Sequence, residues 1–234
     1  MASLKEVKGR IASVNNTRKI TSAMKMVASA KLHKAQAAIE SMLPYERRLH
    51  HILTDFMSNC TEVTSPFIVK REVKKVAVVV FASNTSLCGG FNANVIRHLV
   101  DLLTEYKPLG LENILVFPVG KKVADAVRKL GFRIEGDFQH MADKPSYQEA
   151  ADLAADLMKR FLHGDVDKVE LLYNHFKSTA SQILTRETYL PIDLNNEKKE
   201  EERTIDYILE PSAEELMQEM LPKVLRMKMF PVFL

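Results

Sequence analysis

The sequence is poor in the residues that disulfide frameworks, metal sites and membrane spans require. Its two cysteines, Cys60 and Cys88, lie on unrelated segments without metal-binding or redox spacing. Two such thiols are typical of the cytosol. No apolar run approaches the roughly 20 residues that cross a membrane, and no secretory signal peptide precedes the first amphipathic segment. With 46% hydrophobic and 27% charged residues, the chain is expected to be a globular protein.

Motifs of catalysis and nucleotide binding are also missing. The sequence has no G-x-G-x-x-G, P-loop, HExxH or G-x-S-x-G pattern. Gly89-Gly90 and Gly120-Lys121-Lys122 each stand between an expected strand and an expected helix, where helix amides could hold phosphate. Because both lack the rest of a P-loop, tight turns are the favoured interpretation. We expect no catalytic residue, cofactor or metal ion, and an enzyme acting alone is not expected.

Acidic residues are nearly absent from the first 36 positions. This segment has eight Lys or Arg and one acid, Glu6, for a net charge of +7, whereas the whole chain carries only +3. The asymmetry predicts an acidic partner surface. A mitochondrial presequence is disfavoured, because Lys outnumbers Arg and the helical pattern continues too far. A nucleic-acid-binding helix and the solvated face of a coiled coil remain alternatives.

A long helix is predicted over residues 2–43, because no Gly or Pro stands between Gly9 and Pro44. It would be about 60 Å long. Its apolar residues follow heptad spacing at both ends and form a displaced stripe between them. The heptad positions are Leu4, Val7, Ile11, Val14, Leu32, Ala35, Ile39 and Met42, and the stripe is Ile20, Met24 and Val27. A register that slips in this way indicates a shaft that changes neighbours along its length.

The remainder predicts an α/β domain. Apolar β-branched runs predict buried strands, and helical segments separate most of them, which indicates a mostly parallel sheet covered on both faces. The expected strands are residues 76–81, 114–117, 132–134, 169–173 and 183–190, and a final helix is expected over residues 213–229. The expected organisation is a long basic helical region (1–60), an α/β globular domain (70–195), and a charged loop with a C-terminal helix (196–234).

Three segments resemble signatures of the gamma subunit of F-type ATP synthases. The first is MASLKEVKGRIASV at the N-terminus, followed by NTRKIT at 16–21 and AMKMVA at 23–28. The second is LCGGFN at 87–92, and the third is DYILEPS at 206–212. They occur in the right order across essentially the whole chain, so the sequence is identified as a member of this family.

The resemblance implies a non-catalytic central rotor stalk that couples ion flow through the membrane c-ring to ATP synthesis or hydrolysis in the beta subunits. It implies a Rossmann-like, mostly parallel sheet domain, flanked by a long N-terminal coiled-coil helix and a C-terminal helix. The implied partners are the alpha and beta subunits, the epsilon subunit and the c-ring, with no nucleic acid and only indirect membrane association. Neither a transit peptide nor the inserted cysteine pair of chloroplast relatives is present. A bacterial protein on the cytoplasmic side of the cell inner membrane is therefore expected.

The resemblance also implies roles for particular residues. Four lysines would offer positive charge to acidic lever loops of the beta subunits, and three apolar residues would lie where the shaft turns beneath those levers. The lysines are Lys19, Lys25, Lys31 and Lys34, and the apolar residues are Ile20, Met24 and Val27. Tyr207 and Glu210 match the segment that meets the c-ring and epsilon. A structural turn is matched by Leu87, Cys88, Gly89, Gly90 and Asn92.

Two departures from the family pattern leave alternatives open. The turn before Leu87 has Ser86 in place of a glycine, which would be strained if that position needs a positive φ. Family members continue into a second shaft helix, whereas Pro231 is expected to interrupt the helix here. One alternative is therefore a truncated, non-coupling gamma-like fragment that self-associates through its uncovered helix. The other is a nucleic-acid-binding α/β protein, whose binding would weaken steeply with salt.

Overall fold

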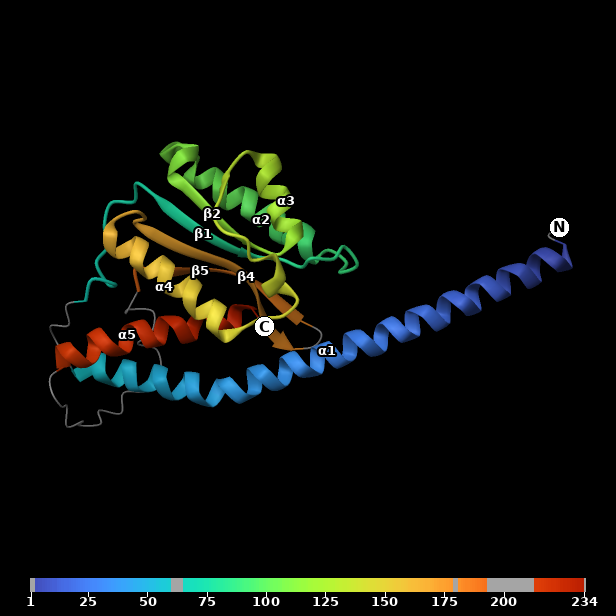
Figure 1. The fold of residues 1–234 in the computed structure, drawn as a ribbon, viewed down its shortest axis with the longest axis horizontal. Helices are drawn as coiled ribbons and strands as arrows, with labels where there is room; N and C mark the ends of the chain where they lie inside the picture. Colours follow the sequence, from blue (N-terminus) through green and yellow to red (C-terminus); the bar gives the residue numbers. More distant parts are fainter. Residues whose placement is uncertain (1–2, 60–64, 179–180, 193–212, 234) are drawn as a thin grey trace. The chain divides into compact units, whose positions relative to one another are not determined.

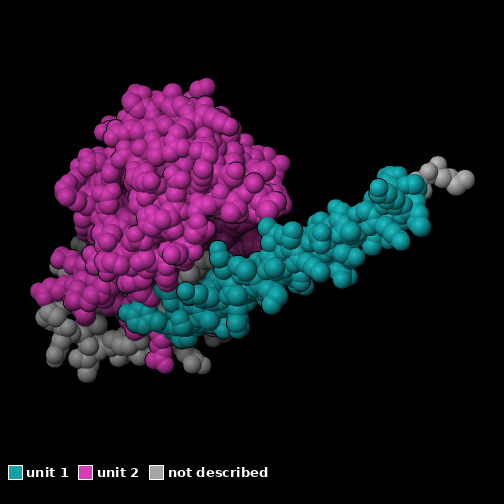
Figure 2. Space-filling model, turned by 45° about the vertical axis from the view of Figure 1, so that its right-hand side comes forward, with its two compact units in different colours: residues 1–45, 234 teal, residues 46–233 magenta. Residues whose placement is uncertain are grey.

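The computed structural model describes residues 3–59, 65–178, 181–192 and 213–233. The chain separates into two compact units, residues 1–45 together with residue 234, and residues 46–233 (Figure 2). The first unit consists of a helix. The second is a three-layer α/β domain.

One helix, α1 (Leu4–Asn59), forms the N-terminal region (Figure 1). Ser3 caps its N-terminus, since the Ser3 Oγ accepts the amide of Glu6 at 3.3 Å, and the Glu6 carboxylate pairs with Arg10 at 2.7 Å one turn further on. The helix does not stop at Pro44, which lies inside it. The missing N–H of Pro44 removes one hydrogen bond from the helix ladder, and the turns on either side continue it.

A five-stranded sheet with the order β3-β2-β1-β4-β5 forms the middle layer of the second unit. β1 pairs in parallel with both β2 and β4, β2 pairs in parallel with β3, and β4 and β5 form an antiparallel hairpin. The strands are β1 (Val76–Phe81), β2 (Ile114–Val119), β3 (Arg133–Ile134), β4 (Lys168–Ser178) and β5 (Ser181–Leu190). The mostly parallel sheet predicted from the sequence is confirmed.

Helices cover both faces of this sheet (Figure 1). Val76, Val78 and Val80 pack with α2 (Phe91–Tyr106) and α3 (Lys121–Leu130) on one face. The alternate residues Ala77, Val79 and Phe81 pack with α4 (Tyr147–His163) and α5 (Ala213–Met229) on the other. Successive side chains of a strand point to opposite faces, and helices cover both faces here. β1 is therefore apolar at every position.

The last two strands differ from the expected elements, whereas the C-terminal helix agrees with them. β4 and β5 are longer than predicted, because polar residues beyond the buried part of each strand still pair with the partner strand. α5 ends at Met229, as predicted, and Pro231 lies in the short 3-10 helix Phe230–Phe233. Pro222 lies inside α5. The charged loop expected between β5 and α5 lies outside the described residues.

Candidate functional site

All seven side chains predicted to bind the alpha/beta hexamer are exposed on α1. Ile20, Met24 and Val27 expose 62%, 53% and 60% of their surface, which is high for large apolar residues. The four lysines are exposed as well: Lys19, Lys25, Lys31 and Lys34. The helix therefore presents apolar area and positive charge together.

Helix geometry divides these residues into a stripe and its borders. At 3.6 residues per turn, Ile20, Met24, Val27, Lys31 and Lys34 fall within an arc of about 80°. Lys19 lies about 60° beyond one edge of this arc, and Lys25 lies about 100° beyond the other edge. The stripe is apolar toward the N-terminus and basic toward the C-terminus.

The heptad residues nearer the N-terminus lie on a different side of α1. Leu4, Ile11 and Val14 expose 75%, 57% and 66% of their surface. On an ideal helix they are roughly opposite to Ile20 and Val27. The slip in register read from the sequence thus separates two apolar faces, and a partner that covers one leaves the other for a second partner.

Hydroxyl groups between these two faces bond within the helix. Thr17 Oγ1 donates to the carbonyl of Ser13 at 3.0 Å, and Thr21 Oγ1 bonds to the carbonyl of Thr17 at 3.0 Å. These two hydroxyls therefore have backbone acceptors within α1 itself.

The turn predicted at residues 87–92 follows β1 and is held together by Asn92. Asn92 Oδ1 accepts the amide of Ser83 at 3.0 Å, while Nδ2 donates to the carbonyl of Thr85 at 2.8 Å and lies 3.1 Å from Cys88 Sγ. Asn92 is only 8% exposed, so one buried amide organises the whole loop.

The anticipated strain at Ser86 is absent. Among the described residues no non-glycine residue has a positive φ, and in this turn it is Gly89, at +58°, that adopts one. A glycine is therefore not required at position 86. Leu87, at the tip of the loop, is 85% exposed.

At the neighbouring turn, which contains Gly120, the side chain of Asn84 forms hydrogen bonds with three other residues of the chain. Asn84 Oδ1 accepts the amide of Lys121 at 2.8 Å, at the start of α3, and Asn84 Nδ2 donates to the carbonyl of Gln139 at 2.8 Å and to Asp143 Oδ2 at 2.6 Å. The carboxyl ends of the strands are where doubly wound sheets bind nucleotides. Here Asn84 takes the place an anion would have at α3, which supports a tight turn over a phosphate site.

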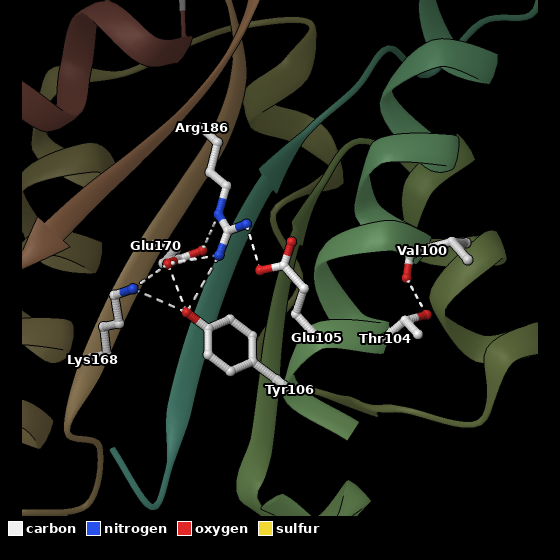
Figure 3. Close-up of polar contacts among 7 residues, drawn as sticks. All are labelled: Val100, Thr104, Glu105, Tyr106, Lys168, Glu170 and Arg186. Atoms are coloured by element: carbon white, nitrogen blue, oxygen red, sulfur yellow. Dashed lines mark hydrogen bonds and ion pairs between the residues drawn. The ribbon is translucent and has the colours of Figure 1, made fainter. Parts of the chain in front are cut away.

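A charged cluster that the sequence analysis missed lies where α2 ends over β4 and β5 (Figure 3). Glu170 of β4 is 1% exposed, and its carboxylate binds Lys168, Arg186 and Tyr106. Arg186 donates from Nε to Glu170 Oε2 at 2.7 Å, and from a terminal nitrogen to Glu105 Oε2 at 2.7 Å. Two acids thus meet two bases, and the buried carboxylate is compensated.

The electrostatics of this cluster keep Glu170 ionised. Burial by itself raises the pKa of the Glu170 carboxyl, but hydrogen bonds from its three donors outweigh burial and leave the pKa below its ordinary value. Burial raises the pKa of Tyr106, and its hydrogen bond to Glu170 raises it further. The available sequence signal was a charged residue, Glu170, within the mostly apolar run of residues 169–173.

The remaining predicted positions give no site geometry. Tyr207 and Glu210 lie outside the described residues. Within the described ranges, His, Cys, Asp and Glu side chains form no group of three that could hold a metal ion. Among the described helices, none combines the length and apolar character needed to cross a membrane.

The structure thus combines a long, exposed, basic helix with an α/β domain built on a five-stranded sheet. The family model described as ATP synthase matches residues 3–234. The ATP synthase gamma chain of Phocaeicola vulgatus is 79% identical over 236 residues, which cover 100% of this chain and 82% of that protein. The gamma chain of Bacteroides thetaiotaomicron is 59% identical, covering 98% and 81%. The chain belongs to the gamma chain family of F-type ATP synthases.

Solved structures share the fold. The central stalk and c-ring structure of the Tetrahymena thermophila mitochondrial ATP synthase contains a chain with a TM-score of 0.60 and 19% identity, covering 91% of this chain and 90% of that one. A rotor chain of the Euglena gracilis mitochondrial ATP synthase gives a TM-score of 0.53 at 17% identity, covering 96% and 83%. The architecture therefore persists where most residues differ.

Proposed function

We propose that this chain is the rotating central stalk of a bacterial F-type ATP synthase. It couples ion flow through the c-ring to ATP synthesis or hydrolysis in the beta subunits and contributes no catalytic residue of its own. The observation that carries this proposal is the exposed stripe of α1, in which large apolar residues and lysines lie on one face. Membership of the gamma chain family supports it independently.

The proposed mechanism is a bias on the conformations of the beta subunits. A shaft can drive a partner between states only if it contacts those states with different free energies. α1 meets this requirement because its apolar residues lie on different sides at different heights, with Ile20, Met24 and Val27 on one side and Leu4 and Ile11 roughly opposite and nearer the N-terminus. Turning such a helix within a ring of subunits brings the stripe at Ile20, Met24 and Val27 to each subunit in turn.

Each predicted contact residue has a distinct role in this proposal. The lysines Lys19, Lys25, Lys31 and Lys34 attract acidic loops of the beta subunits, and the apolar stripe supplies the area that is buried on contact. The turn at residues 87–92 braces the α/β domain. Tyr207 and Glu210 are assigned to the contact with the c-ring and the epsilon subunit.

The family also gives the cellular place. As a relative of bacterial gamma chains, the chain is a peripheral component at a bacterial membrane. We place it on the cytoplasmic side of the inner membrane, held there through the epsilon subunit and the c-ring.

Co-expression with cognate alpha and beta subunits tests the proposal. The unaltered chain is expected to co-purify with them as a complex that hydrolyses ATP. A double charge reversal on α1, Lys19→Glu with Lys25→Glu, should reduce complex formation or ATP hydrolysis by about tenfold, because it replaces attraction by repulsion.

The matched control reverses two exposed lysines of the α/β domain, Lys129→Glu with Lys144→Glu, and changes the net charge equally. It should retain most of the activity. Equal loss in both variants would reduce the effect to net charge, and failure of the unaltered chain to form a complex would contradict the rotor function.

A further inference from the structure

β5 is one of the two edge strands of the sheet, and the end of the β4–β5 hairpin extends beyond β1. β1 pairs with β4 only over Lys168–Leu172. From Tyr173 onward, the described part of β4 pairs with β5 alone. Residues 173–178 and 181–185 therefore form a two-stranded ribbon, and such ribbons are marginally stable without support.

Support on one face comes from Arg186, at the root of the ribbon. Its guanidinium binds Glu170 of β4 at 2.7 Å and Glu105 of α2 at 2.7 Å (Figure 3). Lys168 and Tyr106 complete the bonding of Glu170. One side chain of β5 thus ties the strand to its neighbour and to the C-terminal turn of α2.

Support on the opposite face comes from the next residue, Glu187. Its Oε2 accepts the hydroxyl of Tyr173 at 3.0 Å, and its Oε1 lies 3.4 Å from Lys228 Nζ of α5. Two residues further on, the buried hydroxyl of Tyr189 donates to the carbonyl of Leu225 in α5 at 2.7 Å. This face of β5 is therefore bound to the C-terminal helix.

We infer that Arg186 and Glu187 make β5 a clamp, which joins the helices on the two faces of the sheet and holds the β4–β5 ribbon in one orientation. Consecutive strand residues point to opposite faces, so this pair can reach α2 and α5 at the same time. Arg186 suits the role because its planar fork serves two carboxylates at once. The clamp is a property of the chain itself and does not depend on the rotor function.

Native-state hydrogen exchange of the full chain tests the clamp. The measured quantity is the exchange rate of the paired amides in residues 174–178 and 182–185, divided by the rate for β1. Arg186→Met is expected to raise this ratio about tenfold or more, because hydrogen bonds to charged groups are lost at the root of the ribbon. Glu105→Gln removes only the outer carboxylate and should raise the ratio by a smaller factor.

The matched control is Arg128→Met, which removes the exposed pair of Arg128 with Asp125 at 2.8 Å on α3. It should leave the ratio unchanged. If Arg186→Met does not fold, Glu105→Gln decides by the same ratio. An unchanged ratio, or equal acceleration in β1 and the ribbon, would overturn the clamp, because the cluster would then contribute only to global stability.

Discussion

Gly120, between β2 and α3, has a backbone conformation that other residues rarely adopt, with φ at +103°. A Cβ there would lie 2.0 Å from the carbonyl oxygen of Ala82, which is backbone and cannot turn away. The glycine is thus required by a close approach of two chain segments. In the same turn, Asn84 Oδ1 accepts the first amide of α3.

Gly120→Ala is therefore expected to lower the free energy of unfolding by about 2–4 kcal/mol. Gly9→Ala is the control, since Gly9 lies in α1 and a Cβ added there would meet nothing within 4 Å. That change should be neutral or stabilise the helix by up to about 1 kcal/mol. Urea unfolding followed by circular dichroism measures both, and equal stability of the two variants would contradict the steric argument.

Glu170 gives the stability of the fold a dependence on pH. Its pKa is lower in the folded protein than the unfolded value near 4.5, so its contribution is present above that value. The contribution is lost as the pH falls through the folded pKa, because a protonated Glu170 no longer balances Arg186 and Lys168.

Glu170→Gln should cost about 2–4 kcal/mol at neutral pH, because two cations then lose their buried partner. Its unfolding free energy should also fall less than that of the unaltered protein as the pH drops from about 6 to about 2. Denaturant titrations across this range check both effects. The exposed carboxylate of Glu72, changed to Gln, serves as control, and an equally steep acid loss in Glu170→Gln would exclude the proposed balance.

The helix α5 is held against the sheet by apolar packing and by a hydrogen bond from β5. Met217, Leu221 and Leu225 of α5 are buried in the core they share with α4. The hydroxyl of Tyr189 adds a directed bond to this apolar contact. Burial raises the pKa of Tyr189 well above its ordinary range, so the hydroxyl stays a donor.

Tyr189→Phe should destabilise the protein by about 1–2 kcal/mol, because the bond to the carbonyl of Leu225 is lost in a site that water does not reach. Tyr147→Phe, at a position 43% exposed, should have little effect. Thermal unfolding distinguishes them. A melting temperature unchanged in Tyr189→Phe would show that apolar packing alone docks α5.

α1 differs from these elements because its N-terminal half has little burial. Its large residues from Leu4 to Leu32 are exposed, so in the isolated chain this half depends on helix propensity, the Ser3 cap and local pairs. A helix of this kind gains most of its stability when a partner covers its apolar faces. The positive charge and the exposed apolar stripe therefore both suit this half of α1 for contact with a partner.

The uneven distribution of charge predicts how the chain finds its partners. The first 36 residues carry +7 and the rest of the chain carries −4, so the helix creates a local positive field within a nearly neutral protein. Such a field accelerates association with an acidic surface and is screened by salt.

Changing Lys19, Lys25, Lys31 and Lys34 to Gln should therefore slow association with the alpha and beta subunits at low salt. Raising the salt from about 0.05 M to about 0.5 M should slow the unaltered chain about tenfold and the variant by a much smaller factor. Stopped-flow or surface-based association rates measure this difference. Identical salt dependence would show that these lysines do not steer assembly.

Local patterns in the sequence were enough to predict the long helix, the strands and the family. The helix follows from residues 10–43, which lack Gly and Pro, and β1 follows from its unbroken apolar run, because propensity and periodicity act between near neighbours. The basic character of α1 is likewise a count of side chains. Pro44 and Pro222 show the limit of such rules, since both lie inside helices that continue past them.

The strand order, the antiparallel hairpin and the clusters arise from contacts between distant residues, and local periodicity carries no record of these. Arg186 meets Glu105 across 81 positions, and Asn84 meets Asp143 across 59. Whether Glu170 is an exposed acid or a buried anion depends on Tyr106, Lys168 and Arg186 and on the burial around them. The sequence therefore determined the elements, the charge and the family. Packing determined that Asn84 bonds the first amide of α3 and that Arg186 joins β5 to β4 and α2.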